Sequence, residues 1–223
     1  MPVQSLKERI YSQVLENIIQ GSYPLESLIN EKALVEEFGV SKSPVREALI
    51  ELCNEGVLRS IPRCGYEVVR ITDRDVQEIQ DFRMIIEVGA LDTYWSMLDQ
   101  THVERLQQML DQHYQEGKEY NVLEHWQMNT EFHTELMSCF QNRYLYDRIS
   151  ETLRVLNRAY AQFYWDKWHQ TTSFLSSAGC HRKVVDCIRT GSKEMALEYL
   201  RQDISTFDGA ESGLRPNFSR LHK

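Results

Sequence analysis

Residues 39–58 read GVSKSPVREALIELCNEGVL, and this stretch decides the fold of the first part of the chain. Gly39 is expected to end a short helix over about 30–38, because glycine readily adopts the positive φ of a helix C-terminus. Pro44 lies in the first turn of the next helix, where its missing N–H costs little. The apolar residues at helical spacing are Val45, Ala48, Leu49 and Leu52. Two helices joined by such a tight turn predict a helix-turn-helix.

The flanking sequence completes this motif. An amphipathic pattern over residues 5–20 predicts a preceding helix. After the motif, two apolar-rich runs at 57–61 and 66–70 flank Pro62-Arg63-Cys64-Gly65, a pattern typical of a β-hairpin. Three helices and a hairpin within residues 1–71 predict a winged helix-turn-helix domain.

From residue 72 the pattern becomes that of an all-α helical bundle. Thr72 and Asp75 resemble a capping box, which predicts a helix start. We expect no strand between here and about residue 208. The predicted helices cover 73–97, 101–118, 121–140, 143–169, 174–190 and 193–208. The expected fold class is therefore mainly α, with an all-helical effector-binding and dimerisation domain over 72–210 and a flexible tail over 211–223.

Bulk composition narrows the function class. The net charge of −8 argues against a chain that coats nucleic acid with its whole surface, but it allows a local basic surface. The chain has no apolar stretch of about 18 residues and no signal-peptide pattern, so we expect a cytoplasmic protein without membrane contact. The five cysteines include no CxxC pair, so neither a disulfide framework nor a thiolate zinc site is indicated.

Cationic and small residues gather on the helix-turn-helix and its hairpin. The candidate DNA contacts are Lys32, Lys42, Ser43, Arg46, Arg63 and Gly65. Arg46 lies near the N-terminal end of its helix, opposite the apolar stripe, where recognition helices contact base edges. It can pair bidentately with a guanine or contact a phosphate. A lone cation is usually only a solvated charge, but this grouping on one module favours double-stranded DNA as the partner.

Polar residues interrupt the apolar faces of the helical domain. The candidate metal ligands are Asn129, His133, His181 and Asp203. Asn129 and His133 lie four residues apart within one apolar stripe, so both point inward. Four inward polar groups on three helices converge on one another or on a metal, and this nitrogen and oxygen set suits Zn, Ni, Mn or Fe. Because an inward histidine is more often a hydrogen-bonded core residue, both interpretations stay open.

Residues 39–58 closely resemble the helix-turn-helix signature of the GntR superfamily, roughly G-V-S-R-T-P-V-R-E-A-L-x-x-L-x-x-E-G-L. The segment from about 73 to 210 is similar to the FCD effector domain of its FadR-like branch. The resemblance implies a winged helix-turn-helix. It also implies DNA contacts at five of the candidate positions, Lys32, Lys42, Ser43, Arg46 and Gly65, but not at Arg63. One departure is Lys42, which replaces an arginine and loses a bidentate fork.

The resemblance also implies how the helical domain works. It implies a metal at the four candidate ligands and an effector carboxylate bound by Arg83, with Glu87 as the partner of Arg83 four residues later. Asp203 departs from the family's histidine, so the metal preference is altered or the site is degenerate. Tyr160, Tyr164 and Trp165 suit the wall of a pocket for an anion, although such residues are more often core.

These observations predict a sequence-specific transcriptional regulator, with ligand-relieved repression as the commoner behaviour of the family. A small organic acid or sugar acid is the expected effector, bound partly through a divalent transition metal. Operator symmetry and the resemblance imply a homodimer on two half-sites. One alternative is a metal-free regulator with an apolar or fatty ligand. A metal-dependent enzyme is the other, although no arrangement of general base and nucleophile stands out.

Overall fold

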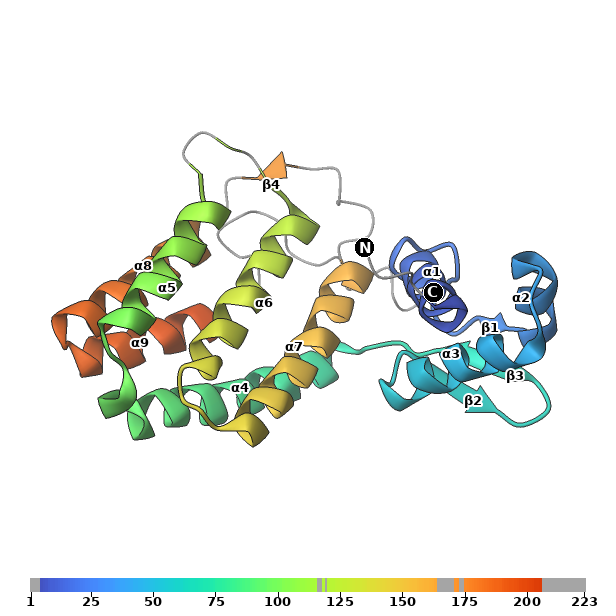
Figure 1. Cartoon of the computed structure of the whole chain (residues 1–223), viewed down its shortest axis with the longest axis horizontal. Helices are drawn as coiled ribbons and strands as arrows, with labels where there is room; N and C mark the ends of the chain where they lie inside the picture. The colour runs from blue at the N-terminus through green and yellow to red at the C-terminus, as the bar shows by residue number, and fades with distance from the viewer. Residues whose placement is uncertain (1–4, 116–117, 119, 164–170, 173–174, 206–223) are drawn as a thin grey trace. The chain divides into compact units, whose positions relative to one another are not determined.

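The computed structural model describes residues 5–115, 118, 120–163, 171–172 and 175–205, and the chain divides into two compact units, Met1–Ile71 and Thr72–Lys223. The first unit is a winged helix-turn-helix, which confirms the fold predicted for it (Figure 1). Its elements are α1 (Leu6–Ile19), β1 (Leu28–Ile29), α2 (Glu31–Phe38), α3 (Lys42–Asn54), β2 (Leu58–Ile61) and β3 (Gly65–Val68).

Local capping signals fix the helices of this unit. The Asn30 side chain accepts a hydrogen bond from the backbone N–H of Lys32 and starts α2. Gly39 ends α2 with a φ of 62°. Helices α1 and α3 pack against each other around a buried apolar core. Its members include Ile10, Val14, Leu34, Val45, Ala48, Leu49, Leu52 and Val68.

The sheet has one strand more than the sequence pattern predicts. The expected hairpin is present as β2 and β3, and β1 pairs antiparallel with the free edge of β3. In this register Ile29 lies opposite Tyr66 and Leu28 opposite Glu67. A strand of two residues is too short to show the alternation of apolar and polar side chains that reveals longer strands.

The second unit is helical, as predicted, but it also contains two very short strands. Its helices are α4 (Asp73–Thr93), α5 (Gln100–His113), α6 (Val122–Ser138), α7 (Arg143–Phe163), α8 (Leu175–Thr190) and α9 (Lys193–Ser205). The expectation of no strand was wrong, because β4 (Tyr120–Asn121) and β5 (Thr171–Thr172) pair antiparallel. The expected helix over 73–97 ends at Thr93, and the 3-10 helix η1 (Trp95–Met97) follows it. Residues 164–169, 206–208 and the expected tail over 211–223 lie outside the described residues.

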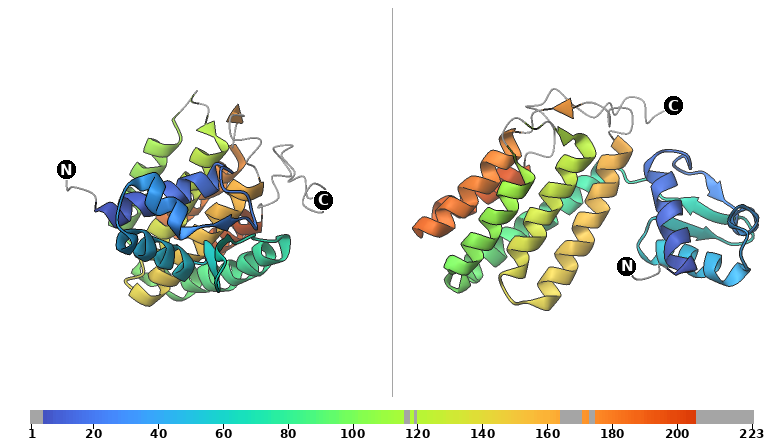
Figure 2. Two further views of the ribbon diagram at one scale, coloured as in Figure 1. Left: turned by 90° about the vertical axis from the view of Figure 1, so that its right-hand side faces the viewer. Right: turned by 45° about the horizontal axis from the view of Figure 1, so that its top comes forward.

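The helices of the second unit form a closed ring. Within the described residues, neighbours pack in the order α4, α7, α6, α5, α8, α9, and α9 packs back against α4. Figures 1 and 2 show α5, α6 and α7 side by side in this arrangement. The inward faces of the six helices therefore share one interior. In the described part of the chain, none of the helices has the length and apolar character needed to cross a bilayer.

Candidate functional site

The interior of the helical ring contains a cluster of buried polar side chains. Its members are Gln80, Arg83 and Glu87 on α4, His125, Asn129 and His133 on α6, His181 on α8, and Asp203 on α9. Buried polar groups are costly unless they are paired with one another or with a ligand. This central cluster is therefore the first place to look for a binding site.

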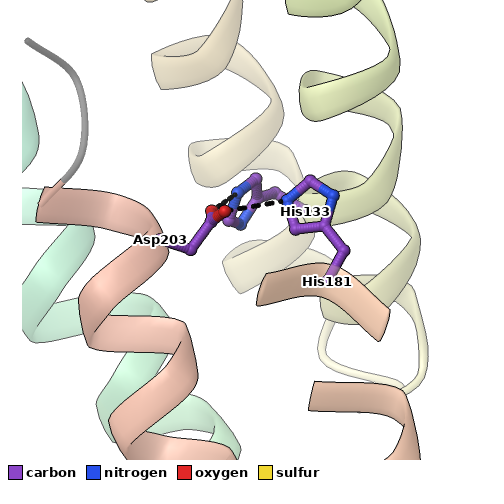
Figure 3. A group of neighbouring side chains, drawn as sticks. All are labelled: His133, His181 and Asp203. Atoms are coloured by element: carbon purple, nitrogen blue, oxygen red, sulfur yellow. Dashed lines mark hydrogen bonds and ion pairs between the residues drawn. The ribbon is translucent and has the colours of Figure 1, made fainter. Parts of the chain in front are cut away.

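His133 lies at the middle of the central cluster and contacts two carboxylates. Its Nδ1 is 2.6 Å from Oε2 of Glu87, and its Nε2 is 2.9 Å from Oδ2 of Asp203. The second oxygen of Asp203 is 3.2 Å from Nε2 of His181. Figure 3 shows the Asp203 carboxylate pointing toward both imidazole rings. One carboxylate on α9 thus connects histidines from α6 and α8.

The charges of these groups depend on one another. Burial lowers the pKa of His133, but the charge of Glu87 and the hydrogen bonds to Asp203 and Glu87 together outweigh burial, so the pKa is raised. Burial raises the pKa of Glu87, but Arg83 and His133 outweigh it and lower the pKa to about 2. Burial also lowers the pKa of His181. Without a metal, these shifts favour a proton on His133, an ionised Glu87 and a neutral His181, and a bound metal would take the place of the His133 proton.

The donor atoms present fit a divalent metal. Ligand atoms of His133, His181 and Asp203 all lie within 4.8 Å of one another. The buried Oδ1 of Asn129 and Nδ1 of His181 have no hydrogen-bond partner among the described residues. Neutral imidazole and carboxylate ligands suit Zn, Ni, Mn or Fe, and unpaired buried atoms of this kind call for a ligand. Glu87 would then orient His133 by accepting a hydrogen bond from its Nδ1.

Arg83 is joined to this group through Glu87. Its Nε donates to Oε1 of Glu87 at 2.6 Å, and its Nη1 donates to Oε1 of Gln80 at 3.2 Å. Arg83 is 1% exposed, and its Nη2 has no hydrogen-bond partner in the described part of the chain. A buried guanidinium with a spare donor can receive an oxygen of an anionic ligand. The structure therefore links the predicted effector residue to the predicted metal ligands.

Sequence reasoning missed Gln80 and His125 of the central cluster, and also Tyr114 beside it. His125 is buried and lies one helical turn before Asn129, on the same face of α6. Burial and the nearby His181 lower the pKa of His125 to about 3, so the ring is neutral at neutral pH. Tyr114, just after α5, has a buried hydroxyl without a hydrogen-bond partner in the described residues, and its ring centroid is 6.3 Å from that of His181. The four-residue spacing of His125 was the available signal.

The aromatic wall expected on α7 is described only in part. Tyr160 is buried and stacks on Trp126 of α6, with ring centroids 3.4 Å apart. Tyr164 and Trp165 lie outside the described residues. This stacked pair contributes to the packing of α6 against α7, next to His125.

Four of the six predicted DNA contacts line a groove on the first unit. This recognition groove has a volume of about 540 Å³, and its lining includes Lys32, Lys42, Arg63 and Gly65. Arg46 is not part of that lining, but its Nε is 4.0 Å from Glu31, which is. Ser43 instead donates a hydrogen bond to Glu47 within α3. Glu31, which the sequence reading did not single out, lies between the cations.

Gly65 has a structural reason to be glycine. Its φ is 130°, and an added Cβ would lie 2.6 Å from the carbonyl oxygen of Ile29. This close approach allows β1 to pair with β3 at the base of the hairpin turn. Arg63 also has a positive φ, of 66°, at the exposed turn. Both residues shape the tip of the wing.

Each of the two units matches a known protein family model. Residues 6–68 match the family model of bacterial regulatory proteins of the gntR family, and residues 78–206, more than half of the chain, match the FCD domain. An uncharacterised HTH-type transcriptional regulator of Bacillus subtilis, YdhC, is 26% identical over 86% of this chain and 84% of its own. The gluconate operon transcriptional repressor of the same organism is 22% identical over 87% of this chain and 80% of its own.

Among solved structures, Escherichia coli McbR/YncC matches 98% of this chain and 99% of its own, with a TM-score of 0.68 and 19% identity. At this identity the likeness shows the fold, and it covers both units. The chain belongs to the GntR family of bacterial regulatory proteins and consists of its helix-turn-helix domain followed by an FCD domain.

Proposed function

We propose that this DNA-binding transcriptional regulator is a repressor controlled by a small carboxylate that binds inside the FCD domain. The family consists of regulators and not enzymes, so the cluster of histidines serves binding. One observation carries the proposal: Asp203 bridges His133 and His181 in a fully buried cluster that also contains Arg83. A bacterial regulator has no structural need for so many buried ionisable groups, because an apolar core would be at least as stable.

The proposed DNA contacts are the six residues of the recognition face: Lys32, Lys42, Ser43, Arg46, Arg63 and Gly65. The N-terminal end of α3 supplies Lys42, Ser43 and Arg46, which suits direct contact with base edges. Lys32 on α2 is exposed and suits a phosphate contact. We further propose that two subunits pair, so that two α3 helices read two half-sites of a symmetric operator.

The proposed metal ligands are Asn129, His133, His181 and Asp203, with Glu87 holding the outer nitrogen of His133. A bound metal supplies a Lewis-acidic position for an effector carboxylate. Arg83 supplies the second positive group, through its Nη2. Because Asp203 is a harder ligand than histidine, we expect the site to accept Mn or Fe as well as Zn or Ni.

The effector proposed is a small organic acid or sugar acid. The unpaired Nη2 of Arg83 favours a carboxylate, and the neutral His125 and the hydroxyl of Tyr114 suit uncharged hydroxyl groups. A relative named for repression of a gluconate operon makes sugar acids a sensible first set of ligands to try. Effector binding would shift the balance between DNA-competent and incompetent states.

A metal-free regulator is the second candidate, and one observation favours it. His133 contacts both Glu87 and Asp203 at hydrogen-bond distance, so a proton on its ring neutralises the cluster in place of a metal. In that case Arg83 would bind the effector alone.

Elemental analysis of the purified, untagged protein separates the two candidates. We expect about one Zn, Ni, Mn or Fe per chain, lost in His133→Ala. His113→Ala is the matched control, because His113 pairs with Glu131 and is not among the proposed ligands. Absence of metal after incubation with each of the four ions would contradict the metal site and leave the metal-free candidate.

A DNA release assay tests the effector site. Carboxylates that release the protein from its DNA should need about tenfold higher concentration with Arg83→Lys, because lysine keeps the charge but loses the planar fork. Affinity for DNA without effector should stay unchanged. Equal release of both proteins by every active carboxylate would remove Arg83 from the effector site.

A further inference from the structure

Glu31 is the one acidic side chain described here in ion-pair contact with two of the proposed DNA-binding cations. It is the first residue of α2, directly after the capping residue Asn30, so the backbone of the helix start fixes its position. Its side chain is only 17% exposed. Lys42 Nζ lies 3.2 Å from Oε1, Arg46 Nε lies 4.0 Å from Oε2, and the Tyr66 hydroxyl donates to Oε2 at 3.4 Å.

We infer that Glu31 is a positioning residue for DNA recognition, which sets the ratio of specific to non-specific DNA binding. It does so by drawing Lys42 and the Nε edge of Arg46 toward one part-buried carboxylate, and by keeping a fixed negative charge in the recognition groove. The inference rests on the proposed DNA contacts of Arg46 and Lys42.

The contact with Arg46 leaves its reading atoms available. Glu31 faces Nε, so both terminal nitrogens of the guanidinium stay free to donate to O6 and N7 of a guanine. An arginine that is attracted to a carboxylate along one edge loses less side-chain freedom when it binds a base, because its range of directions is already narrower. Specific binding therefore gains from Glu31.

The same carboxylate opposes non-specific binding. Binding to DNA without base contacts depends almost entirely on attraction between cations and phosphates. Glu31 neutralises part of the charge of Lys42 and Arg46 and repels phosphates that approach the recognition groove. A sequence that offers only its backbone must overcome this repulsion, whereas a correct base edge presents neutral acceptors.

A neighbouring glutamate on the same helix provides a matched control. Glu36 also pairs with a proposed DNA contact, Lys32, at 3.8 Å. Its side chain is 69% exposed, and such exposed pairs impose little order. Glu31→Gln and Glu36→Gln thus remove the same charge from α2, but only the first removes a part-buried contact with α3.

The experiment uses full-length protein and two DNA duplexes. One carries a site selected by the wild-type protein from a random-sequence library, and the other carries a scrambled site. For Glu31→Gln we expect the ratio of the two affinities to fall about tenfold, the effect of roughly one mismatched base pair. Binding to scrambled DNA should become tighter. Glu36→Gln should leave the ratio unchanged, and Glu31→Asp, which keeps the charge, should restore part of it.

Further outcomes separate this inference from a purely structural role and from failure of the proposed contacts. If Glu31→Gln weakens binding to both duplexes equally and also lowers the melting temperature, Glu31 only supports the fold. If Glu31→Gln and Glu36→Gln lower the ratio of the two affinities equally, only the net charge matters. Either result overturns the inference. Arg46→Ala isolates the underlying proposal: if this variant keeps its preference for the selected site, the proposed contact itself is wrong. If Arg46→Ala loses that preference while Glu31→Gln keeps it, only the role of Glu31 fails.

Discussion

The recognition groove and the central cluster both place one carboxylate between two groups that carry or can accept a proton. On the first unit, Glu31 lies between Lys42 and Arg46, whose side chains are largely exposed. In the second unit, Asp203 lies between His133 and His181, both fully buried. Water screens the exposed contacts, so DNA can compete for them at low cost. The buried contacts have no solvent to replace them, so only a ligand of suitable charge can. The same arrangement of charges is therefore open to competition by solvent and DNA in the first unit and closed to solvent in the second.

The largest expected effect breaks the buried network. Glu87→Gln removes a charge that both Arg83 and His133 contact, so the free energy of unfolding should fall by about 3 kcal/mol or more. Urea denaturation of the purified protein measures this. Glu78→Gln is the control, because Glu78 pairs with Arg74 at the same spacing on the same helix but in solvent. This variant should lower the free energy of unfolding by less than about 0.5 kcal/mol. Similar losses in the two variants would contradict the comparison.

In the first unit, the backbone at Gly65 leaves no room for a side chain. Gly65→Ala should lower the free energy of unfolding by about 2 kcal/mol or more, because the new Cβ meets the Ile29 carbonyl and the φ of 130° is strained for alanine. Gly39 also has a positive φ, but an added Cβ would meet open space, so we expect Gly39→Ala to lower the free energy of unfolding by only about 1 kcal/mol. Thermal or urea unfolding measures both. If the two variants lose equal stability, the close approach at Gly65 is unimportant.

A smaller effect is expected at Arg46, one of the proposed DNA contacts. Arg46→Ala should weaken binding to the selected site by at least about 1 kcal/mol and relax the base preference at one position. Arg59→Ala is a suitable control, because Arg59 pairs with Glu67 on the sheet and is not a proposed DNA contact. Fluorescence anisotropy with labelled duplexes measures both. Unchanged affinity of Arg46→Ala for the selected site would remove Arg46 from the recognition face.

The smallest effect concerns Lys32. Lys32→Ala should weaken binding to selected and scrambled DNA equally and reduce the slope of log affinity against log salt concentration by about one, as expected for one phosphate contact. A salt titration of both duplexes measures the slope. A change in base preference would instead show that Lys32 reads a base.

Local patterns were enough to predict most of the fold. The capping box of Thr72 with Asp75 and the glycine after α2 mark helix ends with near-neighbour interactions, and both are present. The strands β1, β4 and β5 were missed because two residues cannot show a period. Their pairing depends on segments far apart in the chain, which a local pattern does not contain.

The candidate site was predicted in part for the same reason. The position of His133 within an apolar stripe showed that it points inward, and the structure brings it to His181 and Asp203. Its bond to Glu87 joins residues 46 positions apart, and its bond to Asp203 joins residues 70 apart. Glu31 resembled any other charge on a surface helix, because its partners lie on other elements. Spacing within one helix gives the direction of a side chain but not its partner.

The closed ring of helices has a consequence for how the protein is made. The ring closes when α9 packs against α4, and these two helices supply Asp203 and Glu87 on either side of His133. During synthesis the winged helix-turn-helix leaves the ribosome before the helical ring, because it precedes the ring in the chain, and domains generally fold as units. A nascent chain can thus fold its DNA-binding domain well before α9 has been made. The DNA-binding part of the regulator is therefore made before the helical ring, which contains the proposed effector site, can close.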